Sequence, residues 1–244
     1  MSVQPGLHPL PLVSGILDNC LLEWPAMRAR GHAFRQPLDQ VFVAASHVGV
    51  CRALLDSAEG MSGRQVARLA GINHQTCAVA LGRLEEVGVV GRQGSGRTQL
   101  FRLNRENLLV QDLLIPLLQK EREVFPRILR RVGALLVGRC RRALVFGSVA
   151  RGEERPDSDL DLLLLAEGSR ELAATRRGGD EVHAALLKEW GLRVNPIVLT
   201  PQAVETRRRR KDPLVTTILR EGIEVDLARA KGKAGASTRP ATAD

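Results

Sequence analysis

One segment, residues 142–165, limits the fold more than any other part of the chain. It begins with an apolar stretch, Arg142–Phe146, that has the pattern of a buried strand. This stretch runs directly into Gly147–Ser148, and a second apolar strand is predicted at Leu160–Leu165. The segment therefore predicts two neighbouring strands of a sheet with a glycine turn at the end of the first.

Two carboxylates lie at the start of the second predicted strand. Asp159 precedes Leu160, and Asp161 follows it. Side chains alternate along a strand with a period of two, so Asp159 and Asp161 share one face while Leu160 points into the core. Carboxylates side by side repel each other unless a cation lies between them, and Mg²⁺ (or Mn²⁺) is the cation that such groups hold together with substrate phosphates. The pair therefore predicts a metal site.

The glycine turn has the chemistry of a phosphate site. Gly147 lets the backbone approach a ligand closely, and a helix starting at Ser148 would direct its free N–H groups at an anion. A purely structural interpretation also stands, in which Asp159 is a turn residue and Asp161 is a polar group with its hydrogen bonds satisfied. Two aspartates entering an apolar strand are costly without a role, which favours the binding site.

The whole pattern resembles the minimal nucleotidyltransferase family of the DNA polymerase β-like superfamily, over residues 107–226. The matching residues are Gly147, Ser148, Ala150, Arg151 and Gly152, followed by Ser158, Asp159, Asp161 and Leu162. The resemblance implies that Gly147, Ser148 and Arg151 bind a nucleoside triphosphate, with ATP as the first candidate. It implies that Asp159 and Asp161 are catalytic and hold Mg²⁺ for transfer of a nucleoside monophosphate to a hydroxyl group.

The sequence departs from this family at one position. The family carries a third carboxylate on a later strand, which matches Leu192–Leu199 here and places Asn195 at that position. Asparagine can ligate a metal through its carbonyl oxygen, but it carries no charge and is not a base. Asp180 and Glu181 are substitute acids that nothing in the sequence places nearby. We therefore expect weaker metal affinity and slower turnover, and predict nucleotide binding ahead of catalysis. The first hypothesis remains a nucleotidyltransferase, and the second is a transcriptional regulator whose degenerate domain only senses a nucleotide or contacts proteins.

Residues 38–105 carry a second pattern, which resembles the small bacterial winged-helix regulators. Helices are predicted at Val41–Ser57, Gly63–Leu69 and His74–Val87, followed by a β-hairpin with its turn at Gly94–Gly96. The resemblance makes the third helix the recognition helix for double-stranded DNA and the hairpin the wing. The DNA-contacting residues it implies are His74, Gln75, Thr76, Arg92 and Arg97. The alternative is a winged fold used for protein contact or dimerisation.

Composition agrees with a nucleic-acid partner. The formal net charge is +9, and the isoelectric point is about 10.4. An arginine-rich genome would give the same charge. The four cysteines are widely spaced, which predicts buried reduced thiols rather than disulfides or a zinc site. With no long apolar run and no secretory signal pattern, we expect a cytoplasmic protein without a membrane partner.

The sequence thus predicts a mixed α+β and α/β chain in five parts. These are an N-terminal arm (1–37), a winged helix-turn-helix domain (38–105), a helical linker (106–140), a nucleotidyltransferase-like domain with a mixed β-sheet (141–227) and a disordered tail (228–244). Within the linker, Pro116 and Pro126 predict a break or kink. Some members of the family are antitoxins that modify a partner toxin, so such a protein partner is considered, as is a homodimer.

Overall fold

The computed structural model describes residues 36–94 and 99–227. Nearly all of the predicted arm (1–37), the tail (228–244) and Arg97 at the hairpin tip lie outside the described residues. The chain divides into two compact units, Met1–Leu118 and Gln119–Asp244. Each unit has its own hydrophobic core.

The N-terminal unit contains helices followed by a two-stranded antiparallel sheet. Its elements are α1 (Leu38–Val41), α2 (Ala45–Leu54), α3 (Gly63–Leu69), α4 (His74–Glu86), β1 (Val90–Gln93) and β2 (Leu100–Leu103). Ser62 and Asn73 cap α3 and α4, since each side chain accepts a hydrogen bond from a backbone N–H of the first turn. The predicted bounds of these two helices are therefore confirmed to within a residue.

The first predicted helix was wrong in its extent. The chain forms the short helix α1, leaves helical conformation at Phe42 and restarts at Ala45. Val43, which the sequence placed on the apolar face, lies before α2, and 60% of its surface is exposed. Val41 belongs to α1 and Val50 to α2, yet both are buried in the same core. The spacing of apolar residues in the sequence therefore continues across the break between the two helices and does not reveal it.

The predicted linker is helical, and its helix is irregular or interrupted just before each of its two prolines, as the sequence indicates. A π-helix, η2 (Leu109–Leu114), leads into α5 (Ile115–Arg122), and α6 (Val124–Leu136) follows after Glu123. Pro126 lies in the first turn of α6, where its missing N–H would have no helical acceptor. The π-helix ends just before Pro116, so the irregular hydrogen bonding is confined to the turn that precedes the proline.

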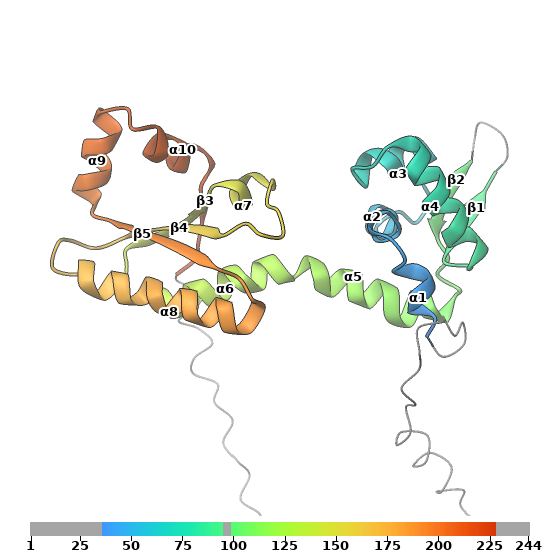
Figure 1. Ribbon diagram of the computed structural model, residues 1–244, viewed down its shortest axis with the longest axis horizontal. Coiled ribbons are helices and arrows are strands. Elements are labelled where there is room, and N and C mark those ends of the chain that lie inside the picture. The colour runs from blue at the N-terminus through green and yellow to red at the C-terminus, as the bar shows by residue number, and fades with distance from the viewer. Residues whose placement is uncertain (1–35, 95–98, 228–244) are drawn as a thin grey trace, which may run out of the picture. The chain divides into compact units, whose positions relative to one another are not determined.

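The C-terminal unit is built on a four-stranded sheet in the order β5–β4–β3–β6 (Figure 1). The strands are β3 (Arg142–Phe146), β4 (Leu160–Leu165), β5 (Val194–Leu199) and β6 (Ile223–Glu224). β3 pairs antiparallel with β4 and with β6, whereas β4 pairs parallel with β5. The prediction of a mixed sheet is thus confirmed, and β6 is a strand that the sequence analysis missed.

Helices cover both faces of this sheet. The remaining ones are α7 (Ser148–Arg151), α8 (Leu172–Trp190), α9 (Pro201–Arg209) and α10 (Pro213–Glu221). Figure 1 shows α6 and α8 along one side of the sheet, with α9 and α10 on the other. Along β4, Leu162 and Leu164 join the core cluster that includes residues of α6 and α8, and Leu163 joins the cluster of Ile218 from α10. By this alternation Asp161 lies on the α10 side.

Two further expectations can be compared with the described residues. Cys51, Cys77 and Cys140 are buried and free, as predicted, and burial raises the pKa of the Cys51 thiol to about 12. Within residues 36–94 and 99–227, no helix is both long enough and apolar enough to cross a membrane.

Leu162 gives a test of the C-terminal core. It is fully buried on the central strand β4, so Leu162→Ala should lower the stability of the C-terminal unit by about 2–5 kcal/mol through lost contacts and a residual cavity. Urea unfolding, with hydrogen exchange of the β4 amides as the readout, measures the change in unfolding free energy. Leu187→Ala, on α8 with 46% of the residue exposed, is the control and should cost far less. Equal destabilisation by both changes would contradict this description of the core.

Candidate functional site

The two predicted metal-binding aspartates face two residues at the start of β5, namely Asn195 within the strand and Arg193 directly before it. Asp161 is the register partner of Asn195, whose side-chain amide Nδ2 donates a hydrogen bond to Asp161 Oδ1 at 3.2 Å. Asp159 lies one residue before β4, where its Oδ1 accepts a hydrogen bond from Arg193 Nε at 2.6 Å. Parallel pairing of β4 and β5 therefore produces two successive rows, Asp159 with Arg193 and Asp161 with Asn195.

Gly147 lies against Asp161 from the other neighbouring strand. Phe146, the last residue of β3, is the register partner of Asp161, and Gly147 follows with φ 77° and ψ −150°. Residues with a side chain essentially never adopt this conformation. A Cβ at this position would also overlap Asp161 Oδ2. Only glycine therefore allows the Asp161 carboxylate to lie against the turn from which α7 begins.

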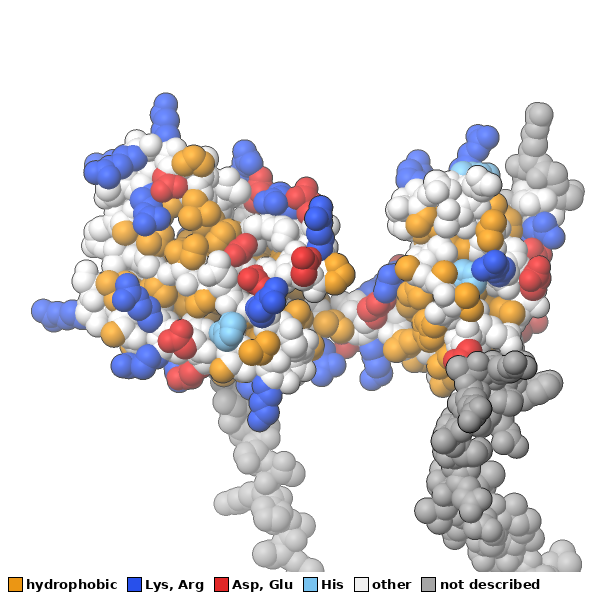
Figure 2. Space-filling model, viewed as in Figure 1, with side chains coloured by type: hydrophobic (Ala, Val, Ile, Leu, Met, Phe, Trp, Pro, Cys, Tyr) orange, Lys and Arg blue, Asp and Glu red, His pale blue; other side chains and the backbone are white. Residues whose placement is uncertain are grey.

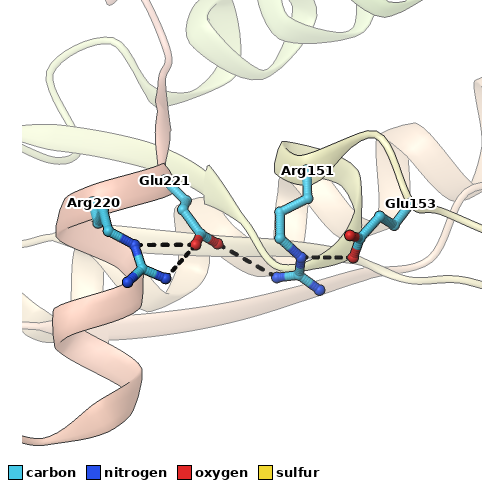
Figure 3. A network of polar contacts seen from close by, with 4 residues as sticks. All are labelled: Arg151, Glu153, Arg220 and Glu221. Atoms are coloured by element: carbon cyan, nitrogen blue, oxygen red, sulfur yellow. Dashed lines mark hydrogen bonds and ion pairs between the residues drawn. The ribbon is translucent and has the colours of Figure 1, made fainter.

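Arg151, at the end of α7, belongs to a network of charged side chains (Figure 3). Its Nε donates to Glu153 Oε2 at 2.7 Å, and its Nη1 lies 3.6 Å from Glu221 Oε2. Glu221, at the end of α10, also accepts from Arg220. Hydrogen bonding from Arg220 and the charge of Arg151 lower the pKa of Glu221, and the bond to Glu153 raises the pKa of Arg151.

The donor set fits one divalent cation more readily than a larger metal centre. Among the residues that the structure describes, no group of three or more His, Cys, Asp or Glu side chains is placed to hold a metal. Asp159 and Asp161 supply two carboxylates, which with phosphate oxygens is a common way of holding Mg²⁺. Glu181, considered above as a substitute acid, pairs with Arg139 instead. Asn195 supplies an uncharged amide, as the sequence indicates.

The C-terminal unit is similar to a known protein family. Residues 127–226 match the family model for the nucleotidyltransferase domain. The C-terminal unit contains a nucleotidyltransferase domain. Comparisons of the chain with curated proteins and with solved structures gave no significant match. The match begins within α6, whose residues Ile128, Val132 and Leu136 are buried in the same core as the sheet.

Sequence reasoning missed four residues around the site of the nucleotidyltransferase domain. Arg193, Glu153 and Glu221 pair with residues that it had identified, and His183 on α8 contacts the backbone of Val194 through Nδ1. Arg193 precedes Asn195 by the same spacing as Asp159 precedes Asp161. The parallel register of the two strands would have revealed that pair, but a sequence alone does not give this register.

The residues predicted to contact DNA lie on the surface of the N-terminal unit. His74, Gln75 and Thr76 form the exposed first turn of α4. Arg92 on β1 is also exposed, and its Nε pairs with Glu85 Oε1 at 2.9 Å. The described side chains of α3, α4 and the hairpin line a groove of about 650 Å³ that includes Arg64, His74 and Arg92. Arg97 lies outside the described residues.

Replacement of Gly147 tests the geometry of the turn. Gly147→Ala combines a backbone strain of about 1–3 kcal/mol with an overlap on Asp161, so we expect a lower unfolding midpoint and loss of nucleotide binding by the domain. Gly152→Ala is a matched control, because Gly152 also has a positive φ (68°) but an added Cβ there meets nothing within 4 Å. It should cost about 1–2 kcal/mol and leave nucleotide binding unchanged. Thermal unfolding and calorimetric titration with ATP, GTP, CTP and UTP measure both effects, and equal loss of binding in the two variants would contradict the role of the Asp161 contact.

Proposed function

We propose that the nucleotidyltransferase domain binds a nucleoside triphosphate with a divalent cation and transfers the nucleoside monophosphate to a hydroxyl group. The observation that carries the proposal is the close contact of Gly147 with Asp161, which places the glycine turn directly beside one of the two carboxylates. Gly147, Ser148 and Arg151 would contact the phosphates, and Asp159 and Asp161 would hold the cation. When bound, that cation neutralises charge on the phosphates and orients them.

In the proposed transfer, the acceptor oxygen forms a bond to the α-phosphorus, and the bond from that phosphorus to the bridging oxygen breaks. Pyrophosphate leaves with the electron pair, and the hydroxyl proton passes to water, since Asn195 cannot accept it. The chain contains no tyrosine, so self-modification at tyrosine is excluded. We propose a hydroxyl of a small molecule or of a partner protein as the acceptor.

A second candidate is a nucleotide sensor that does not transfer the nucleotide. One observation favours it, namely the amide of Asn195 donating to Asp161 where the family resemblance implies a third carboxylate. A neutral group there weakens attraction for the cation and supplies no base. In this case the same turn and carboxylates bind the nucleotide, and the chemistry stops at binding.

Labelled nucleotides distinguish the two candidates. The protein is incubated with ATP, GTP, CTP or UTP labelled on the α-phosphate, with Mg²⁺ or Mn²⁺ and a cell lysate that supplies acceptors. The transferase predicts labelled acceptor with wild-type protein and its loss with Asp161→Ala, whereas Asp180→Ala on α8 serves as the control acid. We expect Asn195→Asp to raise the rate by about a hundredfold, the usual effect of a general base. Binding without label transfer in the wild type and in Asn195→Asp supports the sensor.

For the N-terminal unit, we propose binding to double-stranded DNA. Support comes from three helices followed by a hairpin, and from the exposed first turn of α4. Arg64 and Arg92 beside the groove supply positive charge for phosphates. The net charge alone is weaker support, because Figure 2 shows Lys and Arg spread over the visible face of the C-terminal unit among Asp and Glu.

Salt dependence tests this second proposal. Fluorescence anisotropy with duplex DNA should give a linear fall of log K with log salt, because bound phosphates release counterions. Arg64→Gln should reduce that slope by about 1, and Gln75→Ala should weaken binding to a preferred sequence by about 1–3 kcal/mol. Arg176→Gln, an exposed arginine on α8, is the charge-matched control. Absence of binding to any duplex at low salt would point to protein contact as the role of this surface.

A further inference from the structure

We infer that Arg193 is an internal cation that competes with a divalent metal for Asp159 of the nucleotidyltransferase domain. The inference rests on the metal site of the proposed function and adds a residue that regulates its occupancy. It concerns the side chains just before β4, where the guanidinium of Arg193 already occupies one of the two carboxylate oxygens of Asp159.

The guanidinium of Arg193 is held at two points. Its Nε donates to Asp159 Oδ1 at 2.6 Å, and its Nη2 donates to the backbone oxygen of Asp157 at 2.9 Å. Charge-assisted hydrogen bonds are stronger than neutral ones, so the first contact orients the Asp159 carboxylate toward β5. A metal ligated by Asp159 Oδ1 has to displace Arg193 from that oxygen.

The backbone of Arg193 is fixed as well. Its carbonyl oxygen accepts a hydrogen bond from Leu160 N at 2.8 Å, at the point where β4 and β5 begin to pair. At the next residue, His183 Nδ1 lies 2.8 Å from Val194 O and 3.2 Å from Val194 N. These backbone contacts fix the position of Arg193 opposite Asp159, so the pairing of the strands itself places the two side chains in contact.

The Arg193–Asp159 ion pair is weak enough for a divalent metal to displace the arginine from the carboxylate. The Arg193 and Asp159 side chains are 59% and 45% exposed, so water screens their attraction. A divalent cation that is also bound by phosphate oxygens can displace an exposed arginine. The neighbouring Asp161 accepts a hydrogen bond from the neutral amide of Asn195 rather than from a guanidinium, so we confine the competition to Asp159.

Direct titration of the full-length protein with Mn²⁺, followed by electron paramagnetic resonance of the free ion, tests the inference. Arg193→Gln removes the charge and should raise Mn²⁺ affinity about tenfold, because competition and repulsion are both lost. Arg193→Lys keeps the charge and should stay within about twofold of wild type. Arg131→Gln is the matched control: it breaks the Arg131–Glu189 pair of α6 and α8, on the other face of the sheet, and should change nothing.

If the wild-type protein binds Mn²⁺ too weakly to measure, the same titration is repeated with the Arg193 variants in an Asn195→Asp background. The added carboxylate should raise affinity with and without Arg193, and the ratio between the two should be preserved. Thermal unfolding monitors folding of each variant, since a purely structural Arg193 would lower stability and leave Mn²⁺ affinity unchanged. Equal affinity of wild type and Arg193→Gln overturns the inference about Arg193 alone. Absence of Mn²⁺ binding in every variant overturns it together with the proposed metal site.

Discussion

The parallel pairing of β4 with β5 is the interaction on which the site depends. It places Asp161 opposite Asn195 and brings Arg193 opposite Asp159 one row earlier. The antiparallel pairing of β3 with β4 completes the site. Phe146 lies opposite Asp161 in this pairing, so Gly147, the next residue, lies against the Asp161 carboxylate. A shift of one residue in either register would turn Asp161 to the face covered by α6 and α8 and remove the arrangement.

Local patterns sufficed for the parts of the fold and site that depend on neighbouring residues. Caps at Ser62 and Asn73 and the turn at Gly147 are encoded by residue type, so their positions could be predicted. The break between α1 and α2 could not, since the apolar period continues across it. Arg193 and Glu221 were missed for a different reason. Their partners are distant in sequence, and only the strand register and the return of α10 bring them to the site.

The charge balance of the site separates it from what the family resemblance implies. Three carboxylates would create a strongly negative site that needs metal to admit a triphosphate. Here two carboxylates are accompanied by one guanidinium and one neutral amide. Attraction for a divalent cation is weaker in this arrangement, and repulsion of a triphosphate is weaker too. For the nucleotide binding proposed above, this charge balance predicts a weaker dependence on a metal that is already bound.

Ion pairs within the C-terminal unit further reduce the contribution that positive charge would make to phosphate binding. Arg151 contacts Glu153 and Glu221, and Arg193 contacts Asp159, so both cations nearest the site already have anionic partners. Because each arginine already has an anionic partner, a phosphate that contacted it would add less free energy than a phosphate that meets an unpaired cation. For the nucleotide binding proposed above, affinity would then depend mainly on the shape of the Gly147 turn. In the proposed site, geometry would matter more than total charge, so a single Cβ at Gly147 should weaken nucleotide binding more than the loss of one exposed arginine.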